Sequence, residues 1–430
     1  MSIPKNNNQA PKRLEPKLLF YGAVIVLLGT FLLRVSGGLA TGTLNFYLKS
    51  LGREGLEVGF VAAGYYATEF FLAPIFGAMT DRVGRKLLMA VAPVIGAVAL
   101  LLYPLTSSLE MLFLIRIIEG ISAAAAIPAT LGYLSDLTDG SPHRARIMGM
   151  YEIVTLLGVM GGSIVLGPLL WSALGTGSYP FLAGVYLIGA VVFWFFLPNI
   201  GVRLEKRRSW NDYVKALGNK RLVRFLPAWL AATAVIGLWI VHVQNILSKG
   251  KVPLETGQAL VGGFSPSEVS KYLGFFAFAF LVGLVFWAER SKHGKRSTPM
   301  LYAGGGLLAI SISLFMLNHP EFGLTFFIPT PLEPVSIWFL VLMVGAFFQA
   351  GFTPVALAYL ADISEDFPED RGVVMGLYSI FLAGGNLIGG SLLGGIFVST
   401  LKMDGVILLT FLFTLLAFFS VVNIRRASSD

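Results

Sequence analysis

The sequence predicts an all-α membrane protein with twelve transmembrane helices, arranged as two six-helix halves related by pseudo-symmetry. Of its 430 residues, 55% are hydrophobic and only 13% are charged, with a mean hydropathy of +0.75, which excludes a soluble globular domain. The apolar residues also fall into twelve runs, each long enough to cross a bilayer with roughly 20 residues. Finally, part of the first half is repeated in the second, as expected after duplication.

The predicted spans are separated by short polar loops. They cover residues 18–48, 57–79, 87–106, 110–135, 146–172, 178–198, 224–247, 267–288, 299–318, 336–361, 372–399 and 404–424. The fifth and eleventh runs are long and interrupted by glycines, so we expect irregular helices there. Most of the 32 lysine and arginine residues fall on the N-terminal side of the membrane. Cytoplasmic loops carry such an excess, so we expect a multi-pass protein of the inner or plasma membrane with both termini in the cytoplasm.

The internal repeat covers helices 4–5 and 10–11. YLSDLTD at 133–139 corresponds to YLADISE at 359–365, and MGMY at 148–151 corresponds to MGLY at 375–378. The repeat divides the chain into halves at 18–200 and 224–424, joined by a basic cytoplasmic linker at 201–223. Short cytoplasmic tails, 1–17 and 425–430, complete the predicted organisation.

The composition excludes several other functions. The net charge of +8 comes from cations spread over alternate loops, so a nucleic-acid partner is not expected. With no cysteine, the chain has no disulfides, thiolate metal sites or cysteine nucleophile. The sequence also contains no nucleotide-binding or catalytic motif, so no enzyme activity, cofactor or metal is expected. The expected partners are a small-molecule substrate, protons and the lipid bilayer, and we expect a monomer.

The most informative motif is GAMTDRVGRK at 77–86, between the second and third spans. Two glycines allow a sharp reversal of the chain, and the basic residues favour the cytoplasmic side. The simplest interpretation is a basic turn that only sets the topology of the chain. An aspartate among cations, however, suggests that its carboxylate has a specific partner. The motif resembles the loop 2–3 signature of the major facilitator superfamily, a family of secondary transporters.

This resemblance implies a gate on the cytoplasmic side. Its residues are Gly77, Asp81, Arg82, Gly84 and Arg85 of the loop, together with Asp136 at the end of helix 4. Asp81 is expected to face the N-terminus of helix 11 near Gly372, where unpaired N–H groups attract a carboxylate. Arg85 is expected to reach Asp136. Both contacts should form when the gate is shut and part when it opens.

Polar residues at one depth in the membrane indicate a substrate site. A charge at the centre of a membrane helix costs at least about 2.5–3.5 kcal/mol, so Arg34 and Glu69 are functional candidates, and we expect them to form an ion pair. Gln349 and Asn386 lie at a similar depth in the second half. For these two, hydrogen bonding between helices is an equally good interpretation. His242 on helix 7 completes the candidate substrate-binding set, although a lone histidine is more often a packing residue.

A second group of residues suggests proton coupling. Arg116 and Glu119 lie one turn apart on helix 4, and RIIEGIS at 116–122 resembles the antiporter motif R-x-x-Q-G-x-G. Helix 5 carries glycines and a Gly-Pro step at 167–168, similar to another antiporter motif. Glu69, Glu119, Arg116 and Glu152 are therefore the proton-coupling candidates. For Glu152, a place at the edge of a water-filled cavity without a coupling role is equally consistent.

The resemblance implies a secondary active transporter that works by alternating access, and the antiporter motifs favour a proton-coupled exporter. Helix 1 has Arg34 where many such exporters have an acid, so an anionic or zwitterionic substrate, or a lipid headgroup, suits this site. A lipid or glycolipid flippase on the same fold is the first alternative. A transporter-like sensor that binds a ligand without moving it is the second.

Overall fold

The computed structural model describes residues 15–138, 141, 143–200, 218–250, 257–290, 296–322, 327–328, 335–364 and 371–427. At 81, 82, 144–146, 152, 361, 364, 371–376 and 378 it describes the backbone alone. Within these ranges the chain is almost entirely helical, and one two-stranded sheet joins β1 (Phe327–Ile328) to β2 (Val335–Ser336) in antiparallel register. The architecture is therefore the all-α bundle that the sequence predicts.

The first half contains six crossings. Its elements are α1 (Pro16–Ser50), α2 (Leu56–Val83), α3 (Arg85–Leu102) with the 3-10 turn η1 (Tyr103–Leu105), α4 (Leu109–Leu137), α5 (Arg144–Met160), η2 (Gly161–Leu166), α6 (Gly167–Leu174), η3 (Gly175–Gly177), α7 (Ser178–Val191) and η4 (Val192–Phe196). α5, η2 and α6 together form one crossing, as do α7 and η4.

The second half repeats this plan. Its elements are α9 (Lys220–Leu238), η5 (Trp239–Val243), α10 (Gln244–Leu247), α11 (Pro266–Arg290), α12 (Ser297–Asn318), η6 (Pro320–Phe322), α13 (Ile337–Gln349), α14 (Phe352–Ser364), α15 (Arg371–Asn386), η7 (Leu387–Leu393), α16 (Gly394–Leu401) and α17 (Met403–Ala427). α9 begins at Lys220, four residues before the predicted span, so the end of the predicted linker is helical.

The predicted spans correspond to the helices with small differences at their ends. Eleven described stretches are long and apolar enough to cross a membrane, and one of them, Ile147–Phe196, has 50 residues. A stretch of that length contains two crossings, which brings the count to the predicted twelve. The ends of the predicted runs differ because a helix continues past its apolar part through polar residues, as α9 does at Lys220.

Four crossings contain π-helical segments: η2, η4, η5 and η7. Two of them, η2 and η7, lie in the glycine-interrupted fifth and eleventh runs, where irregular helices were expected. A π-helical turn bonds residue i to i+5 instead of i+4, so it interrupts the regular hydrogen-bond ladder. The sequence gives no comparable signal for η5, which has neither glycine nor proline.

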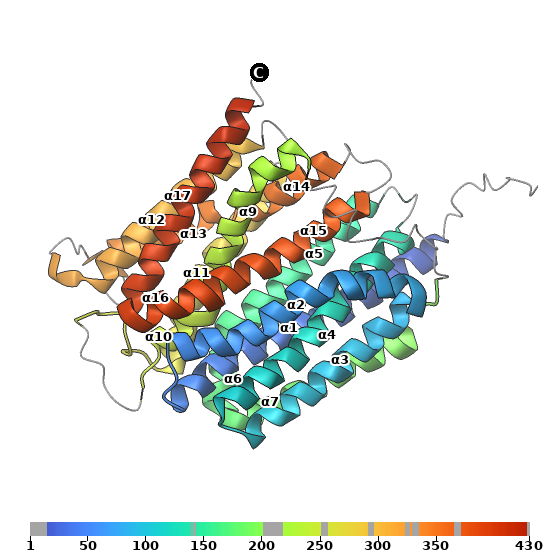
Figure 1. The fold of residues 1–430 in the computed structure, drawn as a ribbon, viewed down its shortest axis with the longest axis horizontal. Coiled ribbons are helices and arrows are strands. Elements are labelled where there is room, and N and C mark those ends of the chain that lie inside the picture. Colours follow the sequence, from blue (N-terminus) through green and yellow to red (C-terminus); the bar gives the residue numbers. More distant parts are fainter. Residues whose placement is uncertain are drawn as a thin grey trace, which may run out of the picture.

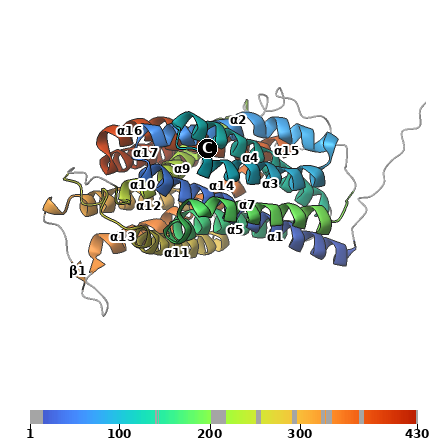
Figure 2. The same cartoon turned by 90° about the horizontal axis from the view of Figure 1, so that it is seen from below.

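The two halves meet at one end of the bundle and diverge at the other. We call the end where α1 begins and α17 finishes the terminal end, and the opposite end the distal end. Figure 1 shows α17 and α1 approaching one another at the distal end and separating toward the terminal end. In Figure 2, β1 lies at the distal end, opposite the start of α1.

An ionic contact joins the halves at the distal rim. Glu54, in the loop between α1 and α2, accepts from Lys402 at 3.0 Å and is also bonded to Lys49. Lys402 lies in the hairpin between α16 and α17 and has a positive φ of 53°. Burial alone would raise the pKa of Glu54, but the two lysines hold it below its usual value. The Glu54 carboxylate therefore stays negatively charged in this contact.

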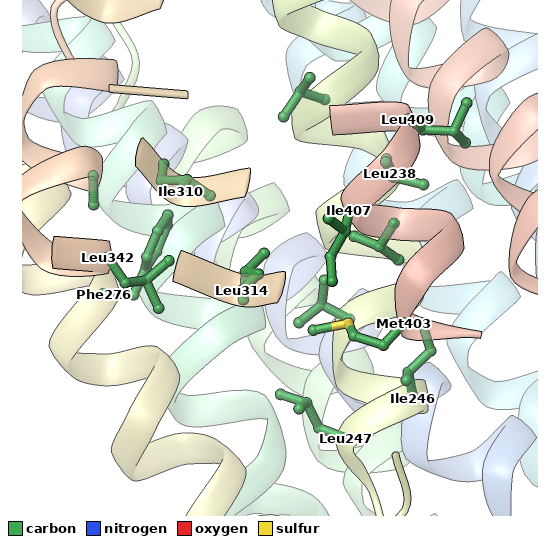
Figure 3. Packing of buried hydrophobic residues seen from close by; sticks show 14 of the residues in the cluster. Leu238, Ile246, Leu247, Phe276, Ile310, Leu314, Leu342, Met403, Ile407 and Leu409 are labelled. Atoms are coloured by element: carbon green, nitrogen blue, oxygen red, sulfur yellow. The ribbon is translucent and has the colours of Figure 1, made fainter. Parts of the chain in front are cut away.

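The largest apolar cluster fills the distal part of the second half, and Figure 3 shows how its members interlock. Residues from α9 and α10 face residues from α17, and side chains from α11, α12 and α13 pack beside them. The labelled members are Leu238, Ile246, Leu247, Phe276, Ile310, Leu314, Leu342, Met403, Ile407 and Leu409. Phe46 of the first half belongs to the same cluster, so the apolar contact crosses between the halves.

His319 ties three elements together just outside the membrane spans. Its Nε2 lies 2.8 Å from Asp404 Oδ1 at the start of α17, and its Nδ1 lies 2.8 Å from Glu321 Oε1 in η6. Burial lowers the pKa of His319, but the hydrogen bonds to these two carboxylates outweigh it and raise the pKa above 6.5. A protonated His319 between two acids therefore stabilises this corner of the second half.

This arrangement predicts a pH-dependent stability. A raised histidine pKa contributes stability that is fully present below pH 6.5 and is lost as the pH rises through the folded-state value. We expect His319→Gln to lower the melting temperature at about pH 5 and to have little effect near pH 9. Thermal unfolding in detergent across this range tests it, with His143→Gln, an exposed histidine, as the control. A difference that does not change with pH would contradict the ion-pair explanation.

Candidate functional site

A buried ion pair lies inside the first half. Arg116 Nη1 is 2.9 Å from Glu119 Oε2 one turn along α4, and the two side chains are 2% and 3% exposed. The hydroxyl of Tyr103, in η1, donates to the same Glu119 oxygen at 2.6 Å. The Arg116 guanidinium also lies 4.6 Å from the centre of the Tyr65 ring on α2. These contacts compensate the charges, as burial of an ion pair requires.

Small residues bring α2 and α4 close enough for this arrangement. A Cβ atom on Gly120 would lie 2.7 Å from the Tyr65 carbonyl oxygen, and one on Gly64 would lie 2.6 Å from the Phe113 carbonyl oxygen. Neither glycine therefore accepts a side chain without movement of the backbone. The glycine that follows Glu119 in the helix-4 motif thus has a packing role beside the buried charges.

Glu69 is a second buried acid, in the middle of α2. Its side chain is 5% exposed, and Arg34 and Arg116 are its charged neighbours. Within the part of the chain that the structure describes, no group donates a hydrogen bond to the Glu69 carboxyl. It therefore differs from Glu119, which has two described partners, Arg116 and Tyr103.

The predicted ion pair between Arg34 and Glu69 is wrong for this structure. Among the described residues, these two charged groups do not approach within the 4.0 Å of an ion pair. The guanidinium of Arg34, which is half-buried, instead lies beside Tyr151 of α5 and Tyr65. A Cβ atom on Gly158 would lie 2.6 Å from Arg34 Cβ, so α5 packs directly against this part of α1. Arg34 and Glu69 were paired because the sequence places them at the same depth in the membrane. The packing of α5 against α1 instead directs Arg34 toward Tyr151.

The second-half candidates lie in different environments. Asn386 is 8% exposed at the end of α15, packs against Gly237, and has a buried Oδ1 without a hydrogen-bond partner. Gln349 is half-buried at the end of α13, where the tenth crossing is interrupted before α14. His242 is 0% exposed, and its Nε2 lies 2.7 Å from the Gly390 carbonyl oxygen in η7. Its Nδ1 is buried without a described hydrogen-bond partner, so a role of His242 in substrate binding stays a prediction.

The loop at 77–86 forms one of its predicted contacts. Arg85 Nη1 is 2.5 Å from Asp136 Oδ2 at the end of α4, and Arg85 also donates to the Gly132 carbonyl oxygen. Gly84, with φ of 99°, connects α2 to α3 in a conformation that favours glycine. A Cβ atom on Gly77 would lie 3.7 Å from Pro128 Cβ of α4, an ordinary contact distance. The predicted Arg85–Asp136 contact is confirmed, whereas its role in gating stays a prediction.

Other predicted residues fall outside what the structure describes. The side chains of Asp81, Arg82 and Glu152 are not among the described side chains, and neither are those of the first residues of α15 around Gly372. The latch between Asp81 and the start of α15, and a role for Glu152 in proton coupling, therefore stay predictions.

Sequence reasoning missed an equivalent contact in the second half. Arg296 Nε lies 3.1 Å from Asp362 Oδ2, which joins the start of α12 to α14. Asp362 corresponds to Asp136 in the internal repeat, so Arg296 takes the place of Arg85. The signal was the Asp136–Asp362 correspondence, which pointed to a partner at the start of the preceding crossing, as Arg85 stands at the start of α3 before α4. Tyr103 and Tyr151 were also missed, because no local pattern connects them to the charges they contact.

Comparison with known proteins agrees with this architecture. The family model described as Major Facilitator Superfamily matches residues 26–328 and 263–429, which together include nearly all of the chain. The chain belongs to the Major Facilitator Superfamily. This member of the superfamily is thus a transmembrane transporter by family, built from the two halves described above.

Two curated relatives are drug-resistance proteins. The chain is 23% identical over 372 residues to the quinolone resistance protein NorA of Staphylococcus aureus (strain MSSA476), covering 85% of this chain and 87% of NorA. It is 24% identical over 392 residues to multidrug resistance protein 2 of Bacillus subtilis (strain 168), covering 87% and 88%. A solved structure of the nucleoside transporter NupG superposes with a TM-score of 0.69 at 14% identity, covering 94% of this chain and 98% of NupG. The NupG match supports the fold alone.

Proposed function

We propose that this superfamily member is a proton-coupled exporter of small organic molecules, working as a monomer with its terminal end in the cytoplasm. The observation that carries the proposal is Glu69, a carboxyl buried in a membrane helix without a described hydrogen-bond donor. Such a group changes its protonation readily when its surroundings change, because its charged form is poorly compensated. The relatives named for quinolone and multidrug resistance support export as the direction.

The charges near Glu69 favour a substrate that carries both signs. Arg34 is half-buried and lies across from Glu69 without forming an ion pair with it. A zwitterionic or anionic molecule can place an acidic group on Arg34, since a guanidinium presents a planar fork of donors. A proton on Glu69 and a substrate cation then compete for the same carboxylate. This competition would couple proton entry to substrate release as the halves rock about the site.

The direct test is transport in inside-out membrane vesicles with a quinolone as the probe. With an acidified lumen, the vesicles should accumulate the quinolone, and an ionophore that collapses the pH gradient should stop accumulation. Orientation is checked with a single cysteine at Lys17, since the natural chain has none. Labelling of this cysteine only from the cytoplasmic side is expected.

Three results would contradict the proposal. Accumulation that is unaffected by collapse of the gradient would remove proton coupling. Transfer of a fluorescent phospholipid between leaflets, in the absence of quinolone transport, would favour the flippase instead. Binding of the quinolone without any accumulation would favour a ligand sensor.

A further inference from the structure

Several side-chain hydrogen bonds join the two halves near the distal end, and three of them share an unusual kind of acceptor. Asn45 Nδ2 on α1 donates to the Ile240 carbonyl oxygen at 2.9 Å. In the opposite direction, Gln244 Nε2 on α10 donates to the Ser163 carbonyl oxygen at 2.6 Å. Ser270 Oγ on α11 donates to the Val165 carbonyl oxygen at 2.8 Å. Each bond therefore runs from a side chain of one half to the backbone of the other.

All three acceptors belong to π-helical segments. Ile240 lies in η5 (Trp239–Val243), and Ser163 and Val165 lie in η2 (Gly161–Leu166). In a π turn the carbonyl groups bond residue i+5 instead of i+4, so the regular ladder is interrupted there. The side chains of the opposite half supply an additional donor to these three carbonyl groups when the halves are together.

The backbones of the two halves are also closely packed at the distal end. A Cβ atom on Gly59 of α2 would lie 2.5 Å from the Ser391 carbonyl oxygen and 2.9 Å from Gly395 Cα. Ser391 belongs to a third π-helical segment, η7 (Leu387–Leu393). Asn245 Nδ2 adds donations to the Asn45 and Arg53 carbonyl oxygens, at 3.2 and 3.3 Å. The backbone of α2 at Gly59 therefore packs directly against the backbone of η7 and α16, with no side chain between them.

We propose that the π-helical segments η2 and η5 form the distal gate of the transporter, with Asn45, Gln244 and Ser270 as its positioning residues. With the gate closed, these side chains bond carbonyl groups of the π turns. Opening replaces each of these bonds with water, which reaches the carbonyl groups only when the halves separate. The π segments thus add polar contacts that water can replace, beside the apolar contact that Phe46 makes between the halves. The proposal concerns the closed and open states alone, so it does not depend on the substrate or the coupling ion.

The test is the population of distal-open molecules, measured by the distance between two spin labels. Cysteines at Thr176 and Ser267, exposed on opposite halves at the distal end, carry the labels in a chain without other cysteines. We expect Gln244→Leu and Asn45→Leu each to raise the ratio of open to closed molecules about two- to tenfold, the effect of one hydrogen bond. Ser270→Ala, which removes only a hydroxyl, should act in the same direction.

Two controls separate hydrogen bonding from packing. Ser172→Ala removes a hydroxyl that bonds Leu169 within its own helix, and it should leave the distances unchanged. Gly59→Ala places a methyl group in the closed contact and should open the gate, whereas Gly184→Ala, with nothing within 4 Å, should not. The proposal fails if Gly59→Ala shifts the distances but none of the three donor variants does. Ser270→Ala keeps this outcome measurable even if the larger substitutions impair folding.

Discussion

Glu69→Gln is expected to reduce transport driven by a pH gradient more than about tenfold while leaving substrate binding measurable, because an amide keeps the shape of the carboxyl but cannot exchange a proton. Glu69 is 5% exposed and has no described hydrogen-bond donor, so the substitution leaves no donor without its acceptor. Its neighbours Arg34 and Arg116 lose a nearby negative charge. Because the amide does not titrate, substrate binding to the Glu69→Gln variant should not change with pH in the range where binding to the wild type does.

The measurement combines two assays on the same preparation. Vesicles with an imposed pH gradient report transport, and binding in detergent at two pH values reports affinity. Glu57→Gln is the matched control, since Glu57 is an ion-paired acid on the same helix with its side chain 35% exposed at the distal end. Normal gradient-driven transport by both Glu69→Gln and Glu119→Gln would show that protons are not coupled through these acids.

The helices could be predicted well, because each crossing needs a run of apolar residues and the loops are short. The irregularities were only partly predictable. Glycines at 161–162 and 389–390 signalled the π segments of the fifth and eleventh crossings. The segment Trp239–Val243 contains no such residue, and its carbonyl at Ile240 is bonded by Asn45 from a helix far away in sequence. Its form therefore depends on tertiary contact, which local sequence does not record.

The candidate site was predictable where both partners lie on one helix. Arg116 and Glu119 are three residues apart, so their contact follows from helix geometry. Arg34 and Glu69 lie on different helices. Their shared depth gives their positions along the membrane normal but not the directions in which their side chains point. Rotation of each helix about its axis depends on packing, such as that of Gly158 against Arg34. For the same reason Tyr103, which follows α3 in a 3-10 turn, could not be connected with Glu119 in advance.

Disrupting the Arg116–Glu119 pair should have the largest effect on stability. Both side chains are almost fully buried, so removing one partner leaves an uncompensated charge inside the protein. Loss of one member of a buried pair typically costs about 3–5 kcal/mol. We therefore expect Arg116→Met to lower the free energy of unfolding by about this amount, since Glu119 then keeps only the Tyr103 hydroxyl. Glu119→Gln should cost less, because an amide oxygen still accepts from Tyr103 and the Arg116 guanidinium still faces the Tyr65 ring.

The double variant Arg116→Met with Glu119→Gln distinguishes a structural pair from a coupling pair. It contains no buried charge at either position, so its stability should recover toward that of the wild type, and the two single effects should not add. Unfolding in mixed micelles measures the three variants against the wild type, and additivity within about 0.5 kcal/mol would show that the pair contributes no interaction energy. If the pair takes part in proton coupling, the double variant should be stable and bind substrate, yet fail to transport under a pH gradient. A stable double variant with normal gradient-driven transport would restrict the pair to a structural role and leave Glu69 as the one candidate of these buried acids for the proton.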